Sequence, residues 1–160
     1  MVHLEELNKY NVWDVLELTV TKEQEEFIAS NEWSLVHAYV CITNGGNALP
    51  FGIYLGKKPI GFVMLGYNLY EEGDPEFYKN SYCIWRFMID KKYQGNGYGK
   101  AAFKMILDYV KTFPCGAADA CFLSYEPENE VAKKLYASFG FVEMPEYYEE
   151  GEEMPAKLTL

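Results

Sequence analysis

The segment Ser81–Lys111 reads SYCIWRFMIDKKYQGNGYGKAAFKMILDYVK and decides the fold of this chain. Its first part, Cys83–Ile89, is apolar and aromatic apart from Arg86, a pattern typical of a strand buried on both faces. Three glycines then alternate with other residues between Gly95 and Gly99. Apolar residues recur at helical spacing from Tyr98 to Val110. The segment therefore predicts a strand, a glycine turn and a helix that begins inside the turn.

The glycine turn is suited to phosphate. The first N–H groups of a helix have no partner within it and lie at the positive end of its dipole, so they can hold phosphate oxygens. A dinucleotide fingerprint would need glycine in place of Lys100, and a P-loop would need glycine and Ser or Thr in place of Gln94 and Ala101. The spacing that fits is Q-x-x-G-x-G, at Gln94, Gly97 and Gly99. The alternative is a tight strand-to-helix turn that binds nothing.

A second segment, Asn129–Val142, reads NEVAKKLYASFGFV. Together the two segments resemble the GNAT superfamily of N-acyltransferases. The first is similar to its acetyl-CoA pyrophosphate loop, and the second is similar to its other core motif, N-x-x-A-x-x-L-Y-x-x-x-G-F. Two matches in this order are more specific than either motif alone. The matching positions of the second motif are Asn129, Ala132, Leu135, Tyr136, Gly140 and Phe141.

The resemblance implies one domain over residues 1–160 with an α/β fold. We expect a mixed, mostly antiparallel sheet of six to seven strands, flanked by about four helices, whose central strand Cys83–Ile89 splays from Ala120–Tyr125. Beyond the central helix, the apolar patterns predict helices at Asn11–Leu18, Thr21–Ile28, Trp33–Val40 and Asn129–Phe139, and further strands at His3–Leu7, Phe51–Leu55, Ile60–Tyr67, Phe141–Met144 and Ala156–Leu160.

The resemblance also implies acetyl-CoA as co-substrate, bound in the splay of the sheet. Backbone groups of the central strand would pair with the pantetheine arm as an added strand does, and amides of the glycine turn would hold the pyrophosphate. Asn129 would contact the CoA arm, whereas the Lys100 side chain on the helix surface is expected to be solvated. The expected cofactor-binding residues are Phe87, Met88, Ile89, Gln94, Gly95, Asn96, Gly97, Tyr98, Gly99, Lys100 and Asn129.

The implied reaction is direct attack of an amine on the thioester. An alkylamine has a pKa near ~10, so it must lose a proton before it attacks, and the leaving thiolate must gain one. By resemblance Tyr136 is the candidate general acid, although its apolar helix face also fits a core tyrosine. Relatives place a carboxylate on the central strand as base, but Ile84–Phe87 has none. A water chain or a carboxylate of Glu71–Glu76 would remove the proton, or the enzyme would take the small neutral fraction of the amine.

The acceptor is expected to be a small cationic amine. The sequence WRFMIDKKYQG and the acidic helix expected at Thr21–Ile28 resemble bacterial spermine/spermidine acetyltransferases. Carboxylates and aromatic rings would hold a polyamine by charge and cation–π contact. The alternatives are a cationic antibiotic, a protein N-terminus and, in another class, a non-catalytic acyl-CoA-binding sensor. A flavodoxin-like nucleotide binder would carry its phosphate loop near the first strand, yet residues 1–20 contain no glycine.

The composition of the chain bears on its binding partners, its cellular compartment and the presence of a metal. The net charge of −10 argues against nucleic acid and anionic membranes, because both reward a basic face. Four cysteines without C-x-x-C spacing, together with no basic and apolar leader, are typical of a reduced cytoplasmic protein. His3 and His37 lack ligand spacing, so no metal site is expected. The resemblance favours a homodimer.

Overall fold

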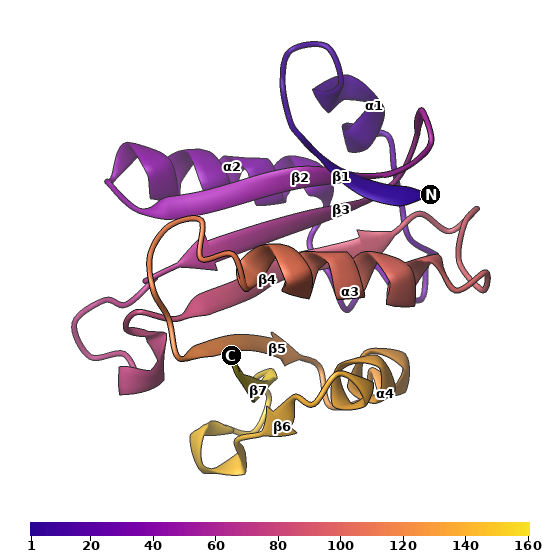
Figure 1. Ribbon diagram of the computed structural model, residues 1–160. Helices are drawn as coiled ribbons and strands as arrows, with labels where there is room; N and C mark the ends of the chain where they lie inside the picture. Colours follow the sequence, from indigo (N-terminus) through magenta and orange to yellow (C-terminus); the bar gives the residue numbers. More distant parts are fainter.

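A computed structural model describes residues 1–160 and contains one seven-stranded sheet in the order β1-β2-β3-β4-β5-β7-β6 (Figure 1). All neighbouring strands are antiparallel except β4 and β5, which are parallel. The predicted α/β fold with a mixed, mostly antiparallel sheet is thereby confirmed. The strands are β1 (Val2–Glu6), β2 (Asn47–Leu55), β3 (Lys58–Tyr67), β4 (Tyr82–Ile89), β5 (Ala120–Tyr125), β6 (Val142–Glu143) and β7 (Met154–Thr159). The helices are α1 (Val12–Leu16), α2 (Asn31–Thr43), α3 (Tyr98–Val110) and α4 (Glu130–Ser138), with short 3-10 helices η1 (Glu76–Tyr78) and η2 (Pro145–Tyr147).

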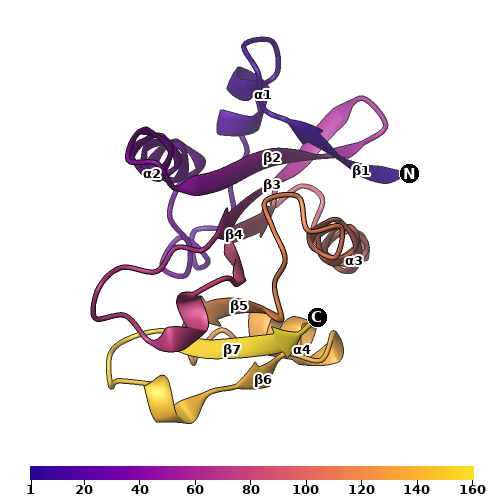
Figure 2. The same cartoon turned by 60° about the vertical axis from the view of Figure 1, so that its left-hand side comes forward.

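Helices cover both faces of the sheet, with α3 on one side and α1 and α2 on the other (Figure 2). Successive residues of β3 point to opposite faces, as a strand requires. Val63 and Leu65 pack in the larger core cluster with α3, whereas Phe62 and Met64 pack in a smaller cluster with α1 and α2. All four side chains have zero exposure, which is why β3 reads as an unbroken apolar run.

The sheet opens between β4 and β5 (Figure 1). β4 pairs with β3 over nearly its whole length, but it meets β5 only at Tyr82↔Cys121 and Cys83↔Phe122. From Ile84 onward its second edge has no strand partner. The register with β3 shifts at Trp85, so the strand bulges where it leaves β5. The predicted splay is therefore present.

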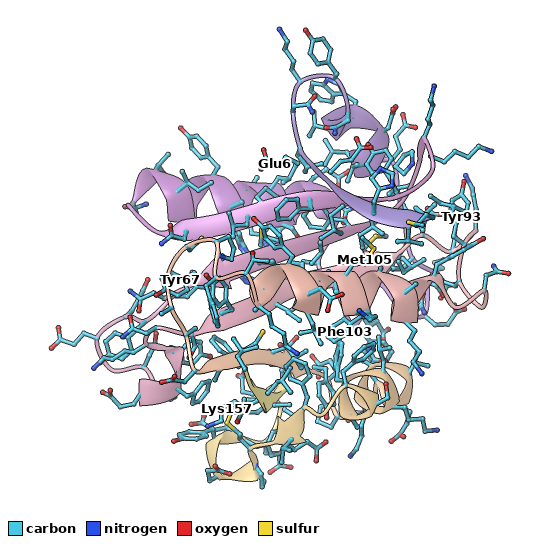
Figure 3. All side chains as sticks on the ribbon, viewed as in Figure 1. Glu6, Tyr67, Tyr93, Phe103, Met105 and Lys157 are labelled. Carbon is cyan, nitrogen blue, oxygen red and sulfur yellow. The ribbon has the colours of Figure 1, made fainter.

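Two helices begin at the opening. α3 starts at Tyr98, immediately after Gly97, as predicted. α4 starts after Asn129, whose side-chain oxygen accepts a hydrogen bond from the Ala132 amide at 3.1 Å. The fully buried Phe103 extends from α3 toward α4 (Figure 3) and places its ring centroid 5.1 Å from that of Tyr136. The aromatic contact fixes α4 against α3.

The predicted helix over Thr21–Ile28 is wrong, because this segment forms a series of turns. A local contact typical of a helix start does form, with the Thr21 amide donating to the Gln24 side chain at 3.1 Å. However, Gln24 also bonds to a residue 70 positions away, and the Thr19 amide donates to Asp90 at 2.9 Å. These long-range bonds set the path of the segment and override its local preference for helix.

Candidate active site

A cavity of about 840 Å³ lies where β4 and β5 diverge. Its walls come from β4, the turn before α3, the end of β5 and α4, and residues 20–29 cover it from a further side. Eight of the predicted site residues line it, namely Phe87, Met88, Ile89, Gln94, Gly95, Gly99, Asn129 and Tyr136.

The turn before α3 presents a row of free amides. None of the backbone N–H groups of residues 94–100 donates to a carbonyl or side chain of the protein, and Gly97 caps α3 without a side-chain bond. Gly95 and Gly97 have φ angles of +76° and +77°, and a Cβ at either position would meet no atom within 4 Å. Glycine is therefore required by the left-handed backbone, which points several donors outward.

Four of the predicted residues, Asn96, Gly97, Tyr98 and Lys100, belong to this turn but do not line the cavity. Asn96 is exposed, and its side chain folds back onto the Gln94 carbonyl at 2.9 Å. The Lys100 side chain is exposed, as the solvated alternative predicted. These residues contribute backbone donors and the shape of the turn, rather than side chains in the cavity.

Gln94 ties the turn to its surroundings. Its side-chain Nε2 donates to the Ile89 carbonyl at 2.8 Å and to Gln24 Oε1 at 2.9 Å. Asn129 lines the opposite wall of the cavity with its oxygen engaged in capping α4, while its Nδ2 makes no hydrogen bond within the protein. The cavity thus has a donor on its α4 wall as well as a row of donors at the turn.

Tyr136 lines the cavity from α4, and its ring packs against Phe103, Tyr125 and Phe141. Its hydroxyl makes no hydrogen bond within the protein, whereas the Tyr125 hydroxyl donates to Glu143 at 2.6 Å. Burial raises the pKa of Tyr136, and the nearby Glu153 carboxylate raises it further. A protonated phenol facing the cavity is therefore available as a proton donor.

A second cavity of about 780 Å³ lies on the α2 side of β4. It is lined by α2, by the loop after β3 and by η1, and it includes the aromatic rings of Tyr70, Tyr78 and Trp85. The two cavities share Ile84, Trp85, Arg86, Ser124 and Glu153. They therefore meet at the bulge of β4, beside the point where the strands diverge.

Arg86 lies at this junction and is the only lysine or arginine in either wall. One guanidinium nitrogen donates to the Trp85 carbonyl at 2.8 Å and another lies 3.4 Å from His37 Nδ1, whereas the buried Nε has no partner. Burial lowers the pKa of Arg86, and the charge of Glu153 opposes this shift. From the sequence alone, Arg86 stands out only as the one charged residue that interrupts an apolar strand.

Carboxylates line both cavities. The acidic loop named as a source of the base contributes only Glu71, which reaches the second cavity, whereas Glu76 pairs with Lys79 at 2.9 Å. Glu153, just before β7, faces both cavities and accepts a hydrogen bond from Ser124. Sequence reasoning missed Glu153, because nothing in the glutamate-rich loop marks which of its glutamates lines the cavities. The other glutamates of the first cavity are Glu25, Glu26, Glu126, Glu128 and Glu130.

The cysteines offer no activated nucleophile. All four are free, and Cys83 and Cys121 are buried in β4 and β5. Burial raises the pKa of the Cys83 thiol, and it raises the pKa of Cys121 to about 12. Since the thiolate is the nucleophilic form, these burials disfavour acyl transfer through a cysteine.

The fold and site define a class of protein. An unpaired strand edge can pair with the amides of a pantetheine arm, and a turn of free amides beside it can hold a diphosphate, so this is an acyl-CoA-dependent acyltransferase. Residues 8–141 match the sequence profile described as "Acetyltransferase (GNAT) family". The chain therefore belongs to the GNAT acetyltransferase family, and it is an acetyl-CoA-dependent amine N-acetyltransferase.

Two curated relatives come from Bacillus subtilis. The chain is 32% identical over 128 residues to a protein of subspecies natto named "Probable spermine N(1)-acetyltransferase", covering 79% of this chain and 78% of the relative. It is 31% identical, with the same coverage, to the "Spermine/spermidine N(1)-acetyltransferase" of strain 168. The crystal structure of aminoglycoside acetyltransferase AAC(6')-Ib in complex with coenzyme A has the same fold, with a TM-score of 0.76 at 15% identity, covering 99% of this chain and 95% of that one.

No three His, Cys, Asp or Glu side chains come together in a way that would hold a metal ion. No helix combines the length and the hydropathy that a bilayer span demands.

Proposed function

We propose that this chain transfers the acetyl group of acetyl-CoA to a primary amine of a polyamine such as spermidine or spermine. The observation that carries the proposal is the charge of the two cavities, whose walls hold seven glutamates in all and a single arginine, Arg86, with no lysine. A flexible polycation gains attraction from such walls along its whole length. The two curated relatives with polyamine names support the same acceptor.

The first cavity would hold acetyl-CoA. Phe87, Met88 and Ile89 would pair through their backbone with the pantetheine arm along the free edge of β4. The amides of residues 94–100 would bind the pyrophosphate, and Asn129 would donate through its free Nδ2. This arrangement would place the thioester near the junction of the cavities, where Tyr136 is the proposed acid for the departing thiolate.

The second cavity would hold the acceptor. Its aromatic rings and Glu71 offer cation–π and ionic contact to the ammonium groups that do not react. An alkylammonium contact of this kind already occurs beside it, because Lys79 Nζ lies 4.3 Å from the ring centroid of Tyr70. Trp85 and Glu153 at the shared wall would face the nitrogen that is acetylated.

A thiol-release assay over a panel of amines tests this function. Spermidine and spermine should give the highest kcat/KM, ahead of kanamycin and of a peptide with a free N-terminus. A clear preference for either of the latter would replace the polyamine with that acceptor. Thermal stabilisation by acetyl-CoA, with no CoA release from any amine, would instead support a non-catalytic sensor.

A matched pair of glutamates tests the acceptor cavity. Both side chains are exposed, but Glu71 lines this cavity and the neighbouring Glu72 lines neither cavity. Glu71→Gln should raise the KM for spermidine several-fold with little change in kcat, and Glu72→Gln should leave both near the wild-type values. Equal effects of the two substitutions would mean that only the overall charge matters.

Three further features of the chain belong to the same proposal. Residues 1–160 would act as one domain, in the cytoplasm, where the four free cysteines stay reduced. A homodimer would cover exposed apolar side chains of α2, among them Trp33 and Tyr39. Sedimentation equilibrium of the wild-type protein and of a Trp33→Ser variant measures that assembly directly.

A further inference from the structure

We infer that Glu153 is the catalytic base, accepting a proton from the acceptor ammonium where the two cavities meet. This inference rests on the proposed function. The base cannot come from β4, because that strand carries Arg86 and no carboxylate beside the first cavity. Glu153 is the one carboxylate in the walls of both cavities.

The position of Glu153 is held from β5. Ser124 Oγ donates a hydrogen bond to Glu153 Oε2, although the two residues are 29 positions apart. Ser124 lies on β5 opposite Pro155 of β7, two positions beyond Phe122, the last β5 residue that pairs with β4, and it also lines both cavities. The hydroxyl therefore orients one carboxylate oxygen and leaves the other for the acceptor.

The surroundings of Glu153 connect it to the reacting groups. Its charge raises the pKa of Tyr136, the proposed proton donor, and opposes the lowering of the pKa of Arg86 by burial. Its side chain is exposed, so a proton taken from the acceptor can pass on to water. The charge of Glu153 affects the pKa of five titratable groups, which are Tyr78 on η1, Cys83 and Arg86 on β4, Glu126 after β5 and Tyr136 on α4. Glu152 directly precedes it in the same loop.

The protons balance as follows. The acceptor ammonium gives one proton to the Glu153 carboxylate, and the freed nitrogen lone pair forms the C–N bond to the thioester carbonyl carbon. The C–S bond breaks, and the leaving sulfur takes a proton from the Tyr136 hydroxyl. The nitrogen then loses a second proton, which reprotonates the Tyr136 tyrosinate, and Glu153 releases its proton to solvent. One ammonium and one thioester thus give one amide, one thiol and one proton.

The test compares Glu153→Gln with Glu152→Gln, an exposed neighbour that lines neither cavity. At pH 7 the first variant should lose at least ~10²-fold in kcat/KM for spermidine, which is the usual contribution of a general base, and the second should stay near wild type. Acetyl-CoA should raise the melting temperature of all three proteins equally.

The pH profile separates a base from a structural group. Without the carboxylate, only amine that is already neutral can react, so log kcat/KM of Glu153→Gln should climb with a slope near one toward the amine pKa of ~10. The wild type should instead be flat over the same range, between pH 6.5 and 9.

Two outcomes would overturn the role of Glu153. One is an unchanged kcat/KM in Glu153→Gln, and the other is a loss that is equal at every pH, which would show a structural or binding role. Failure of the wild type to release CoA with any amine would contradict the proposed function instead, so the two failures are distinguishable.

Discussion

The side-chain amides of Gln24 and Gln94 are hydrogen bonded to each other in both directions, at 3.1 and 2.9 Å. The pair joins the segment that covers the first cavity to the turn whose amides are free. Gln94 is thereby held against the Ile89 carbonyl, which it contacts at 2.8 Å. The shape of the turn depends on a residue that is distant in sequence.

We predict that Gln24→Ala weakens acetyl-CoA binding by roughly 3- to 10-fold, the value of one net hydrogen bond. The reason is that Gln94 loses the partner that orients it. Calorimetric titration with acetyl-CoA measures the change, and Lys22→Ala in the same segment, with an exposed side chain, is the control. An unchanged affinity would mean that the Ile89 contact alone fixes the turn.

Gly97→Ala should reduce both stability and acetyl-CoA affinity. An alanine there adopts φ of +77° at a cost of about 1–2 kcal/mol, and relaxation of that strain moves the amides. Gly56→Ala in the turn between β2 and β3 is the matched control, since its φ is +62° and its Cβ also meets nothing within 4 Å. Both variants should lose similar unfolding free energy, but only Gly97→Ala should bind acetyl-CoA more weakly. Equal acetyl-CoA affinities of the two variants would show that the turn is not part of the cofactor site.

Tyr136→Phe should lower kcat by ~10²- to 10⁴-fold while leaving acetyl-CoA affinity nearly unchanged. Only the hydroxyl is lost, and that group makes no contact that holds the fold. Tyr109→Phe on α3, away from both cavities, removes a hydroxyl in the same way and should keep full turnover. Rapid single-turnover measurements check the chemical step directly. A kcat close to wild type would make Tyr136 a core residue only.

The bond between Tyr125 and Glu143 should make stability depend on pH. The hydrogen bond from Tyr125, and then that from Lys133, lower the pKa of Glu143 below its ordinary value of 4.5. A lowered pKa adds stability that is fully present above pH 4.5 and is lost as pH falls through the folded-state value. The melting temperature of Tyr125→Phe should therefore fall below that of wild type at pH 7, and the difference should shrink toward pH 3.

Tyr67→Phe is the control for this titration. Its hydroxyl donates to the Ala117 carbonyl at 3.0 Å, so the acceptor is a backbone carbonyl and not a carboxylate. The loss of melting temperature in that variant should be the same at pH 7 and at pH 3. A difference for Tyr125→Phe that does not change with pH would contradict the assigned cause.

The parts of the fold that depend on local pattern were predictable from the sequence. Ala120–Tyr125 is β5 at the predicted bounds, and α3 begins in the glycine turn. Apolar runs of strand length and a glycine turn leading into a helix carry this information within a few residues. The cavity-lining positions of Gln94, Asn129 and Tyr136 followed from two motifs on those same elements.

The rest depends on contacts between distant segments. The turns over Thr21–Ile28 replace a predicted helix because Gln24 and Thr19 bond to residues after β4. Glu153 is one of several glutamates in its loop, and only the pairing of β7 with β5 brings it to Ser124. The second cavity joins α2, the loop after β3 and β4, so no single stretch of sequence describes it.

The shared wall at Ile84, Trp85, Arg86, Ser124 and Glu153 has a kinetic consequence. Under the proposed assignment each substrate has a cavity of its own, and no cysteine lies in the shared wall to carry the acyl group, so turnover should proceed through a ternary complex and initial-rate plots should intersect. Because the two cavities share this wall, one bivalent ligand should be able to occupy both. A polyamine covalently joined to CoA through the acyl carbon would fill both cavities. Once the CoA part is bound, the polyamine part would bind at a high effective concentration.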